Sequence, residues 1–262
     1  DPLIDGGAWM SGDQPELVFG LVGPVGVNLE RIQTQLADCL RAVNYAPAFI
    51  RISDLMSQIA TVEETSDCDV SPMAYYERKI RQGNSICKLC ENNAALAALA
   101  ISEIRRIRQR IHQNNRVSLS DPSHLLDRPL AGYAYIIRQL KRPEEVLFLR
   151  QVYGSRFIQV SVHADREHRR RILASKFTSQ NPNLDAKQCE NYAEELIERD
   201  LRELSEPYGQ RLEDVFHLGD VFVSDHSEDV SARTIRRFIE AFFGKNSISP
   251  NRDEFAAYIA AS

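Results

Sequence analysis

A glycine-rich turn between a buried strand and an amphipathic helix is the feature that most constrains how this chain folds. The apolar run at residues 16–22 (ELVFGLV) is typical of a strand buried in a parallel sheet. The turn at 23–28 follows, and from Leu29 to Val43 apolar residues recur every three or four positions, as on one face of a helix. Residues 47–52 (PAFIRI) predict a second strand, so the chain opens with a strand–helix–strand unit.

Strands and helices alternate along the rest of the chain. Three further apolar segments predict strands at 130–139, 157–162 and 215–223. Helical patterns occupy residues 73–113, 143–152, 165–178, 185–204 and 232–243. This alternation predicts an α/β fold with three layers, in which helices cover a mostly parallel, five-stranded sheet.

Composition narrows the class of protein. The 262 residues carry a formal net charge of −5, whereas a protein that binds nucleic acid without specificity is usually basic. No apolar run in the sequence has the length of a membrane-spanning helix, so we expect no membrane partner. The five cysteines are odd in number and irregularly spaced, which indicates reduced thiols and a cytoplasmic location.

The glycine-rich turn stands where nucleotide-binding proteins carry a phosphate-binding loop. Gly23 and Gly26 occupy the positions of the first and middle glycines of the Walker A signature, but Leu29 and Glu30 replace its lysine and its serine or threonine. Small residues before a helix let backbone N–H groups surround an anion. One interpretation is a phosphate cradle without the catalytic groups, and the other is a tight turn that only packs the helix on the sheet. The candidate phosphate-binding residues are Gly23, Pro24, Val25, Gly26, Val27 and Asn28.

Basic residues after the third and fourth strands are further candidates for phosphate binding. Arg138 and Arg142 lie at the carboxyl end of the third strand, the edge where open parallel sheets bind ligands. Arg166, Arg169 and Arg170 follow the fourth strand, where nucleoside monophosphate kinases have a helix whose arginines lead into the lid over the phosphates. Since arginine forks match phosphate oxygens, we expect these side chains to contact a phosphate-bearing ligand. The alternative is a solvated helix surface.

The sequence holds no complete set of ligands for a metal. Cys87 and Cys90 form a lone CxxC pair, whereas a structural zinc site needs four ligands. His226 and Glu228 imitate the HxE of zinc nucleotide deaminases, but no PCxxC follows them. We therefore predict neither a metal ligand nor a catalytic residue in this sequence.

Four segments of the chain resemble a known family. They are similar to the N-terminal P-loop domain, a nucleotide-kinase-like module, of bacterial anti-phage dCTP/dCMP deaminases, and the resemblance spans residues 16–262. The segments are ELVFGLVGPVGVNLERIQTQL (16–36), AALAALAISEIRRIR (94–108), AYIIRQLKRPEEVLFLRQVYGSRFIQVSVHADREHRRRIL (134–173) and DVFHLGDVFVSDHSEDVSARTIRRFIEAFFGKNSISPNRDEFAAYIAAS (214–262).

The resemblance implies a regulatory role in antiviral defence. In that family a zinc-dependent deaminase domain follows this module and converts dCTP or dCMP to dUTP or dUMP, which deprives phage replication of dCTP. The implied organisation is a flexible tail at 1–15, a nucleotide-binding domain at 16–248, and at 249–262 the start of a deaminase domain that is absent here, together with its zinc. The implied partners are dCTP or another nucleoside triphosphate, the deaminase domain, a second copy of the chain and a small regulatory RNA.

Two other functions remain open at this point. One is an active nucleotide or nucleoside kinase with a divergent loop, in which Lys141 or Lys176 replaces the missing lysine. The other is a scaffold for oligomerisation or RNA binding, which the arginine-rich segment at 105–110 favours. The sequence alone therefore leaves open whether this chain is an enzyme.

Overall fold

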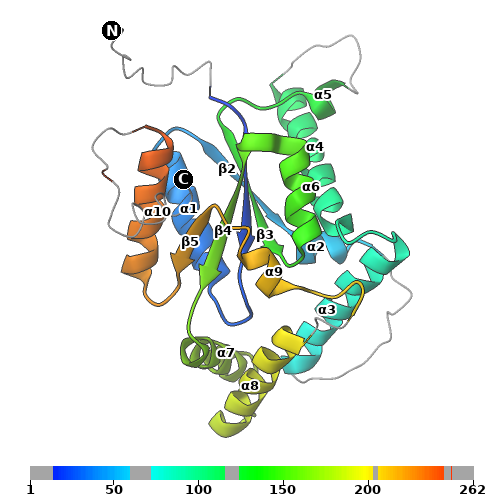
Figure 1. Ribbon diagram of the computed structural model, residues 1–262, viewed down its shortest axis with the longest axis vertical. Coiled ribbons are helices and arrows are strands. Elements are labelled where there is room, and N and C mark those ends of the chain that lie inside the picture. The colour runs from blue at the N-terminus through cyan, green and yellow to red at the C-terminus, as the bar shows by residue number, and fades with distance from the viewer. Residues whose placement is uncertain (1–13, 60–71, 116–123, 203–205, 245–248, 250–262) are drawn as a thin grey trace.

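Five parallel strands form the central sheet in the computed structural model, which describes residues 14–59, 72–115, 124–202, 206–244 and 249. The strands are β1 (Leu17–Val22), β2 (Ala46–Arg51), β3 (Tyr133–Leu140), β4 (Phe157–His163) and β5 (Val221–Ser224). Their order across the sheet is β2-β3-β1-β4-β5 (Figure 1). The predicted three-layer α/β architecture is confirmed, and every described strand pair is parallel.

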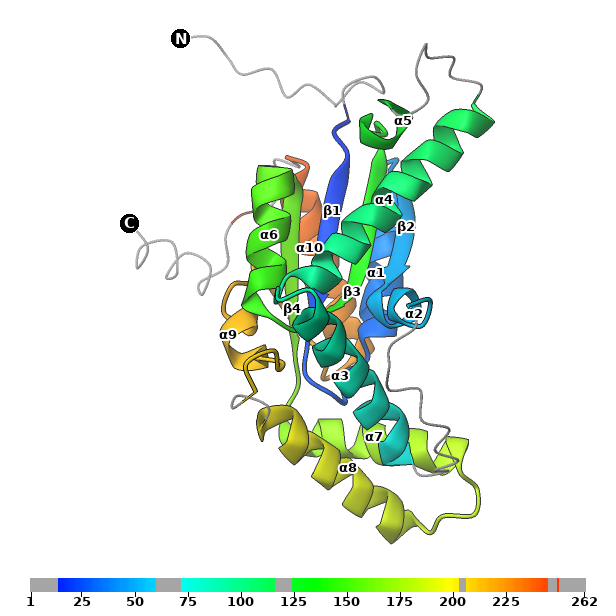
Figure 2. The ribbon, with the colours of Figure 1, turned by 90° about the vertical axis from the view of Figure 1, so that its right-hand side faces the viewer.

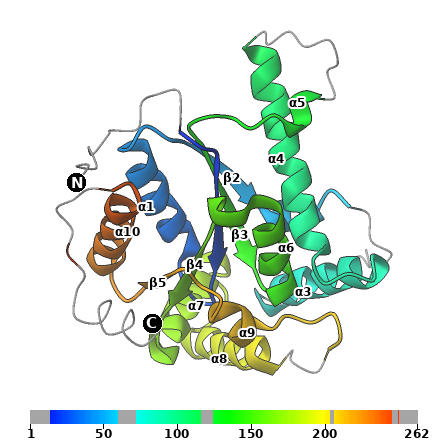
Figure 3. The same ribbon diagram turned by 45° about the horizontal axis from the view of Figure 1, so that its top comes forward.

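Helices cover both faces of this sheet, as Figures 1 and 3 show. On one face lie α1 (Leu29–Arg41) and α10 (Glu228–Phe242). On the other face lie α4 (Ala95–Asn114), α6 (Pro143–Tyr153) and the short helices α2 (Ile52–Met56) and α9 (Leu212–Phe216). A one-turn helix, α5 (His124–Asp127), contacts α4, and a short 3-10 turn, η1 (Gly154–Arg156), precedes β4.

The remaining helices lie at the end of the sheet toward which the strands point. The helix α7 (Arg166–Gln180) follows β4 and pairs with α8 (Ala186–Arg202), and α3 (Pro72–Leu89) runs toward that pair (Figure 2). Apolar side chains that include Phe177 and Leu196 form a separate buried cluster between α7 and α8. These helices therefore stand near the carboxyl ends of the strands, the edge where parallel sheets bind ligands. None of the helices that the structure describes has both the length and the apolar character needed to cross a membrane.

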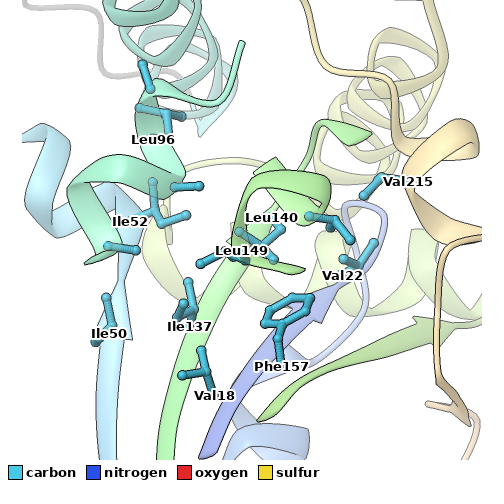
Figure 4. Packing of buried hydrophobic residues seen from close by; sticks show 14 of the residues in the cluster. Val18, Val22, Ile50, Ile52, Leu96, Ile137, Leu140, Leu149, Phe157 and Val215 are labelled. Atoms are coloured by element: carbon cyan, nitrogen blue, oxygen red, sulfur yellow. The ribbon is translucent and has the colours of Figure 1, made fainter. Parts of the chain in front are cut away.

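Strand β1 is buried on both faces, which explains its uninterrupted apolar sequence. Val18 and Val22 belong to the cluster beneath α4 and α6, together with Ile137 of β3 (Figure 4). Phe19 and Leu21 belong to the cluster beneath α1 and α10. Successive side chains of a strand point to opposite sides, so a strand covered by helices on both faces needs apolar residues at every position.

The fifth strand begins later along the chain than predicted. The prediction covered residues 215–223, but β5 begins only at Val221. The residues before it form α9, which buries Leu212 and Val215 against the core beside α6. The apolar run at 215–223 therefore contains the end of a short helix and a strand. So short an apolar run does not distinguish a helix from a strand.

The predicted helix at 73–113 is divided into α3 and α4. At the division Glu91 has a positive φ of 49°, and the Asn92 side chain accepts the Ala94 N–H at 2.8 Å. Asparagine side chains that bond nearby backbone groups compete with helix formation. The division lets α4 pack on the sheet while α3 turns toward α7 and α8.

Parts of both predicted terminal segments lie outside the described residues. Gln14, within the predicted tail at 1–15, is attached to the domain, because its carbonyl accepts the Gly132 N–H at 3.0 Å and its amide donates to the Val43 carbonyl at 3.2 Å. Residues 1–13 are outside the described part of the chain, as is the predicted start of a following domain from residue 250 onward.

Candidate functional site

A cavity of about 580 Å³ opens at the carboxyl edge of the sheet. Its walls come from the turn after β1, the start of α1, the ends of β2 and β3, and the helices α2, α3 and α7. Ligand pockets for small molecules have volumes in this range, and in parallel sheets they occur at this edge. The lining includes Val25, Gly26, Val27, Asn28, Glu30, Arg51, Tyr75, Lys79, Arg138 and Lys176.

The glycine-rich turn is fixed at both of its ends. The Asn28 side chain accepts the Arg31 N–H at 3.0 Å and so caps α1. The Val25 side chain is buried in the apolar cluster between α7 and α8. The turn thus joins β1 and α1 to the α7–α8 pair, which supports the interpretation that it is a packing turn.

Two buried carboxylates of the chain accept hydrogen bonds from backbone N–H groups of this turn. The Val25 N–H donates to Asp200 of α8 at 2.9 Å, and the Asn28 N–H donates to Asp225, which follows β5, at 2.7 Å. Asp225 is fully buried, and Asp200 is 5% exposed. The turn therefore binds anionic oxygens, as a phosphate-binding loop does, but these oxygens belong to its own chain.

The glycine at position 26 is required by a neighbouring helix. Gly26 has a φ of 89°, and a Cβ there would lie 2.8 Å from the Arg169 carbonyl oxygen and 3.0 Å from the Arg169 Cα. The backbone of α7 therefore approaches Gly26 at the place where the sequence predicted a phosphate. Of the six predicted turn residues, those from Val25 to Asn28 line the cavity, whereas Gly23 and Pro24 are outside its described lining.

Four cationic side chains line the cavity, apart from those held in buried ion pairs. They are Arg51, Lys79, Arg138 and Lys176, and Glu30 is an exposed carboxylate among them. Arg51 is the last residue of β2, Arg138 lies two residues before the end of β3, and the two are direct partners in the register of these strands. Glu30 lies 3.7 Å from Arg51 and 3.6 Å from Arg138. Since like charges at paired positions destabilise a sheet, the carboxylate between them offsets their repulsion.

The helices α3 and α7 bring lysine and tyrosine side chains to the cavity. Lys79 Nζ donates to a backbone carbonyl of α2 at 3.1 Å and to the hydroxyl of the serine that caps the C-terminus of α2 at 2.6 Å. Lys176 Nζ donates to the Tyr76 hydroxyl at 2.8 Å. Burial and, to a smaller extent, the charge of Arg78 lower the pKa of Lys79. Tyr75 is half exposed and stands edge-on to Tyr76. This part of the cavity therefore presents cations next to an accessible aromatic ring.

Arg142, which the sequence predicts to bind phosphate, has hydrogen-bond partners within the chain. It is 1% exposed, and its guanidinium donates to Glu145 at 3.2 Å and to the Tyr208 carbonyl at 3.0 Å. Its neighbour Lys141 is bound to Asp200 at 3.3 Å. Buried donors of this kind are already satisfied, so they hold α6, α8 and the segment before α9 in place. Arg138 and Arg142 both belong to the lining of the cavity, and Arg142 differs in that its guanidinium is held by buried partners of the chain.

The three arginines after β4 have different surroundings. Arg166 and Arg170 are bound in exposed ion pairs with glutamates of α7 and α8. Arg169 is 9% exposed, and its Nε and Nη1 atoms have no hydrogen-bond partner among the described residues. Burial lowers the pKa of this guanidinium. All three are outside the described lining of the cavity, and Arg169 is the one that packs against the turn.

An Arg169→Met variant is expected to unfold with a free energy about 1 kcal/mol higher than the wild type, because it removes buried donors that lack partners. Arg170→Gln is the matched control, and we expect no measurable change from it because Arg170 lies in exposed ion pairs. Equilibrium urea unfolding, followed by circular dichroism, measures both. A clear loss of stability in Arg169→Met would contradict the assignment of Nε and Nη1 as buried donors without partners.

Several residues that complete the cavity were not singled out from the sequence. Arg51 lies at the carboxyl end of β2 as Arg138 lies near that of β3, so the rule that selected Arg138 also selects Arg51. Tyr75 and Lys79 come from α3, and no motif in that helix indicates that it reaches the sheet edge. The bond between Asp200 and the turn joins residues 175 positions apart, and neither local sequence indicates it.

The described residues contain no group of three or more His, Cys, Asp or Glu side chains arranged to hold a metal ion. His226 lies beside His168, with ring centroids 5.5 Å apart, and its Nδ1 is 3.4 Å from Asp165. Glu228 is the first residue of α10. These residues do not fit the zinc site that the resembled deaminases carry.

Comparisons with known proteins identify no family for this chain. No protein-family model matches it, and no curated protein matches it. Among solved structures it is similar to an uncharacterized protein from Eubacterium ventriosum ATCC 27560, with 10% sequence identity and a TM-score of 0.42. That match covers 86% of this chain and 98% of the other chain.

Proposed function

We propose that this chain binds a nucleotide in the cavity at the carboxyl edge of its sheet, as the regulatory module of an anti-phage deoxycytidine-nucleotide deaminase. The observation that supports binding is the gathering of four cations, Arg51, Lys79, Arg138 and Lys176, around a cavity of nucleotide size. The resemblance of the sequence segments at 16–36, 94–108, 134–173 and 214–262 supports the deoxycytidine class and the regulatory role.

The side chains of the cavity suit the two halves of a nucleotide. Arg51 and Arg138 present guanidinium forks that match phosphate oxygens, and the N-terminus of α1 lies beside them and favours an anion. Tyr75 on α3 offers an exposed ring on which a base can stack. In the proposed complex the nucleotide extends from the ends of β2 and β3 to α3.

Phosphoryl transfer has less support than binding alone. A kinase needs a cation at the β- and γ-phosphates of its substrate. Leu29, at the position of the Walker lysine, is buried in the core beneath α1, and Lys141 is bound to Asp200. Lys176 is bound to the Tyr76 hydroxyl. Lys141 is thus neutralised by a buried carboxylate, whereas Lys176 keeps its charge, because its hydrogen-bond partner is a hydroxyl.

The scaffold alternative also has little support in the described residues. Arg105, Arg106 and Arg108 of α4 are each paired with a carboxylate of the same chain. An RNA-binding surface needs cations that are available to phosphates. These pairs neutralise most of the arginine-rich segment at 105–110 that had favoured RNA.

Isothermal titration calorimetry with dCMP, dCTP, dTTP, ATP and GTP tests the proposal. We expect a deoxycytidine nucleotide to bind, with an affinity that falls as salt is raised, because the ligand phosphate meets partly exposed cations. Tyr75→Ala is expected to weaken binding about tenfold, since base–aromatic stacking contributes roughly 1–3 kcal/mol.

Phe222→Ala is the matched control for the tyrosine variant. Phe222 is 46% exposed on β5, at the far edge of the sheet from β2, and is outside the described lining of the cavity. Its replacement is expected to leave the affinity unchanged. The proposal fails if no nucleotide of the panel binds, or if both aromatic variants bind as the wild type does.

A further inference from the structure

We infer that Arg51 and Arg138 form a subsite for a single phosphate monoester, and that the Glu30 carboxylate occupies this subsite when no ligand is bound. The ligand class is then a nucleoside monophosphate, in place of a triphosphate. This inference rests on the proposed nucleotide binding and states where its phosphate lies and what it displaces.

Arg138 is the more buried of the two arginines, and its charge needs an anion nearby. The side chain of Arg138 is 10% exposed, whereas that of Arg51 is 45% exposed. A cation that has lost most of its water is destabilised unless an anion lies close to it. Since Arg51 stands at the paired position of the next strand, it adds a second positive charge to the same place.

Glu30 supplies that anion weakly. Its side chain is 74% exposed, and its distances of 3.7 and 3.6 Å to the two arginines are longer than direct hydrogen bonds. Ion pairs with such an exposed partner contribute little, so the carboxylate can leave at low cost. A phosphate monoester carries up to two charges and three oxygen acceptors, and it satisfies two arginine forks better than one carboxylate does.

The glycine-rich turn is a poorer place for further phosphates. The N–H groups of Val25 and Asn28 are already bound to the carboxylates of Asp200 and Asp225. A phosphate chain that extended to this turn would meet these two negative charges and the buried Val25 side chain. Two N–H groups of the turn are thus occupied by carboxylates of the chain itself, whereas the arginine pair is covered only by the exposed Glu30 carboxylate, which a ligand can displace.

The test compares the full chain with its Glu30→Gln, Arg51→Gln and Arg138→Gln variants by calorimetry with dCMP, dCTP, inorganic phosphate and deoxycytidine. We expect dCMP to bind more tightly than dCTP, and Glu30→Gln to tighten dCMP about threefold or more, because a competing anion is removed. Arg138→Gln and Arg51→Gln are expected to weaken dCMP about tenfold or more and to leave deoxycytidine unaffected. Inorganic phosphate should compete with dCMP.

Matched controls come from α1, the helix that carries Glu30. Asp38→Asn removes one negative charge and Arg41→Gln one positive charge. These two residues pair with each other at 2.7 Å and are outside the described cavity lining. Neither control should change the affinity for dCMP. If dCTP binds more tightly than dCMP and Glu30→Gln binds as the wild type does, the inference is overturned while nucleotide binding stands. If neither nucleotide binds to any variant, the proposed function is overturned together with it.

Discussion

A Gly26→Ala substitution is expected to lower the free energy of unfolding by about 3 kcal/mol, although it adds only one methyl group. The Cβ would lie within 2.7–3.0 Å of the Cβ, carbonyl oxygen and Cα of Arg169, so α7 must move before the side chain can fit. The φ of 89° adds the strain that any residue other than glycine has in this region. Because α7 also holds Val25, its displacement is expected to loosen the α7–α8 cluster.

Gly244→Ala separates the two causes of this destabilisation. Gly244 has a φ of 72°, and a Cβ there would meet no described atom within 4 Å, so this variant keeps the dihedral cost without the collision. We expect it to lose about 1 kcal/mol. Equilibrium urea unfolding of both variants gives the comparison. Equal losses at the two glycines would mean that α7 does not press on the turn as the structure has it.

The sequence suggests a Gly26 substitution as a test of phosphate binding, but the contact with α7 gives such a variant a second effect. A glycine in a turn between a strand and a helix is required either by a ligand or by another part of the chain, and the local sequence is the same in both cases. At Gly26 the structure supplies a neighbour, the backbone of Arg169. A loss of ligand affinity in a Gly26 variant would therefore report the movement of α7 as much as a blocked phosphate.

The fold could be predicted from the sequence because its main signals are local. The run at 16–22 is apolar at almost every position because helices cover β1 on both faces, and that burial leaves its mark on the strand's own residues. The periodicity from Leu29 onward likewise reflects one face of α1 against the sheet. Short elements such as α2 and α9 bury only two residues each, so their patterns are too brief to be assigned.

The site was predictable only in part, because the role of a cation depends on the partner that tertiary structure brings to it. Arg138 and Arg142 are four positions apart and looked equivalent in the sequence. Both belong to the lining of the cavity, but Arg142 is held by hydrogen bonds to Glu145, Asn84 and the Tyr208 carbonyl. The last two acceptors come from segments 58 and 66 residues away, so nothing near Arg142 in the sequence distinguishes it from Arg138.

Arg108 likewise depends on a distant partner, and its replacement is the second substitution expected to cause a large loss of stability. An Arg108→Ala variant is expected to lose about 3–5 kcal/mol of stability, because it leaves the buried Glu16 carboxylate without its counter-ion. Glu16 precedes β1 and is 4% exposed; it accepts from Arg108 Nε at 3.0 Å and from the Leu130 N–H at 3.2 Å. Burial opposes the charge of Arg108, but the hydrogen bond and the charge of Glu16 outweigh it and raise the pKa of Arg108. The pair therefore joins α4, the entry to β1 and the segment before β3.

Two further variants distinguish this ion pair from ordinary packing. Arg106→Ala removes an exposed arginine of the same helix, paired with Glu103, and should cost about 0.5 kcal/mol or less. The double variant Glu16→Leu/Arg108→Met removes both charges and keeps their volume, so it should recover most of the stability that Arg108→Ala loses. Urea unfolding of the three variants measures these differences. If the double variant is as unstable as Arg108→Ala, the loss comes from side-chain packing around α4, and the buried charge of Glu16 is not its cause.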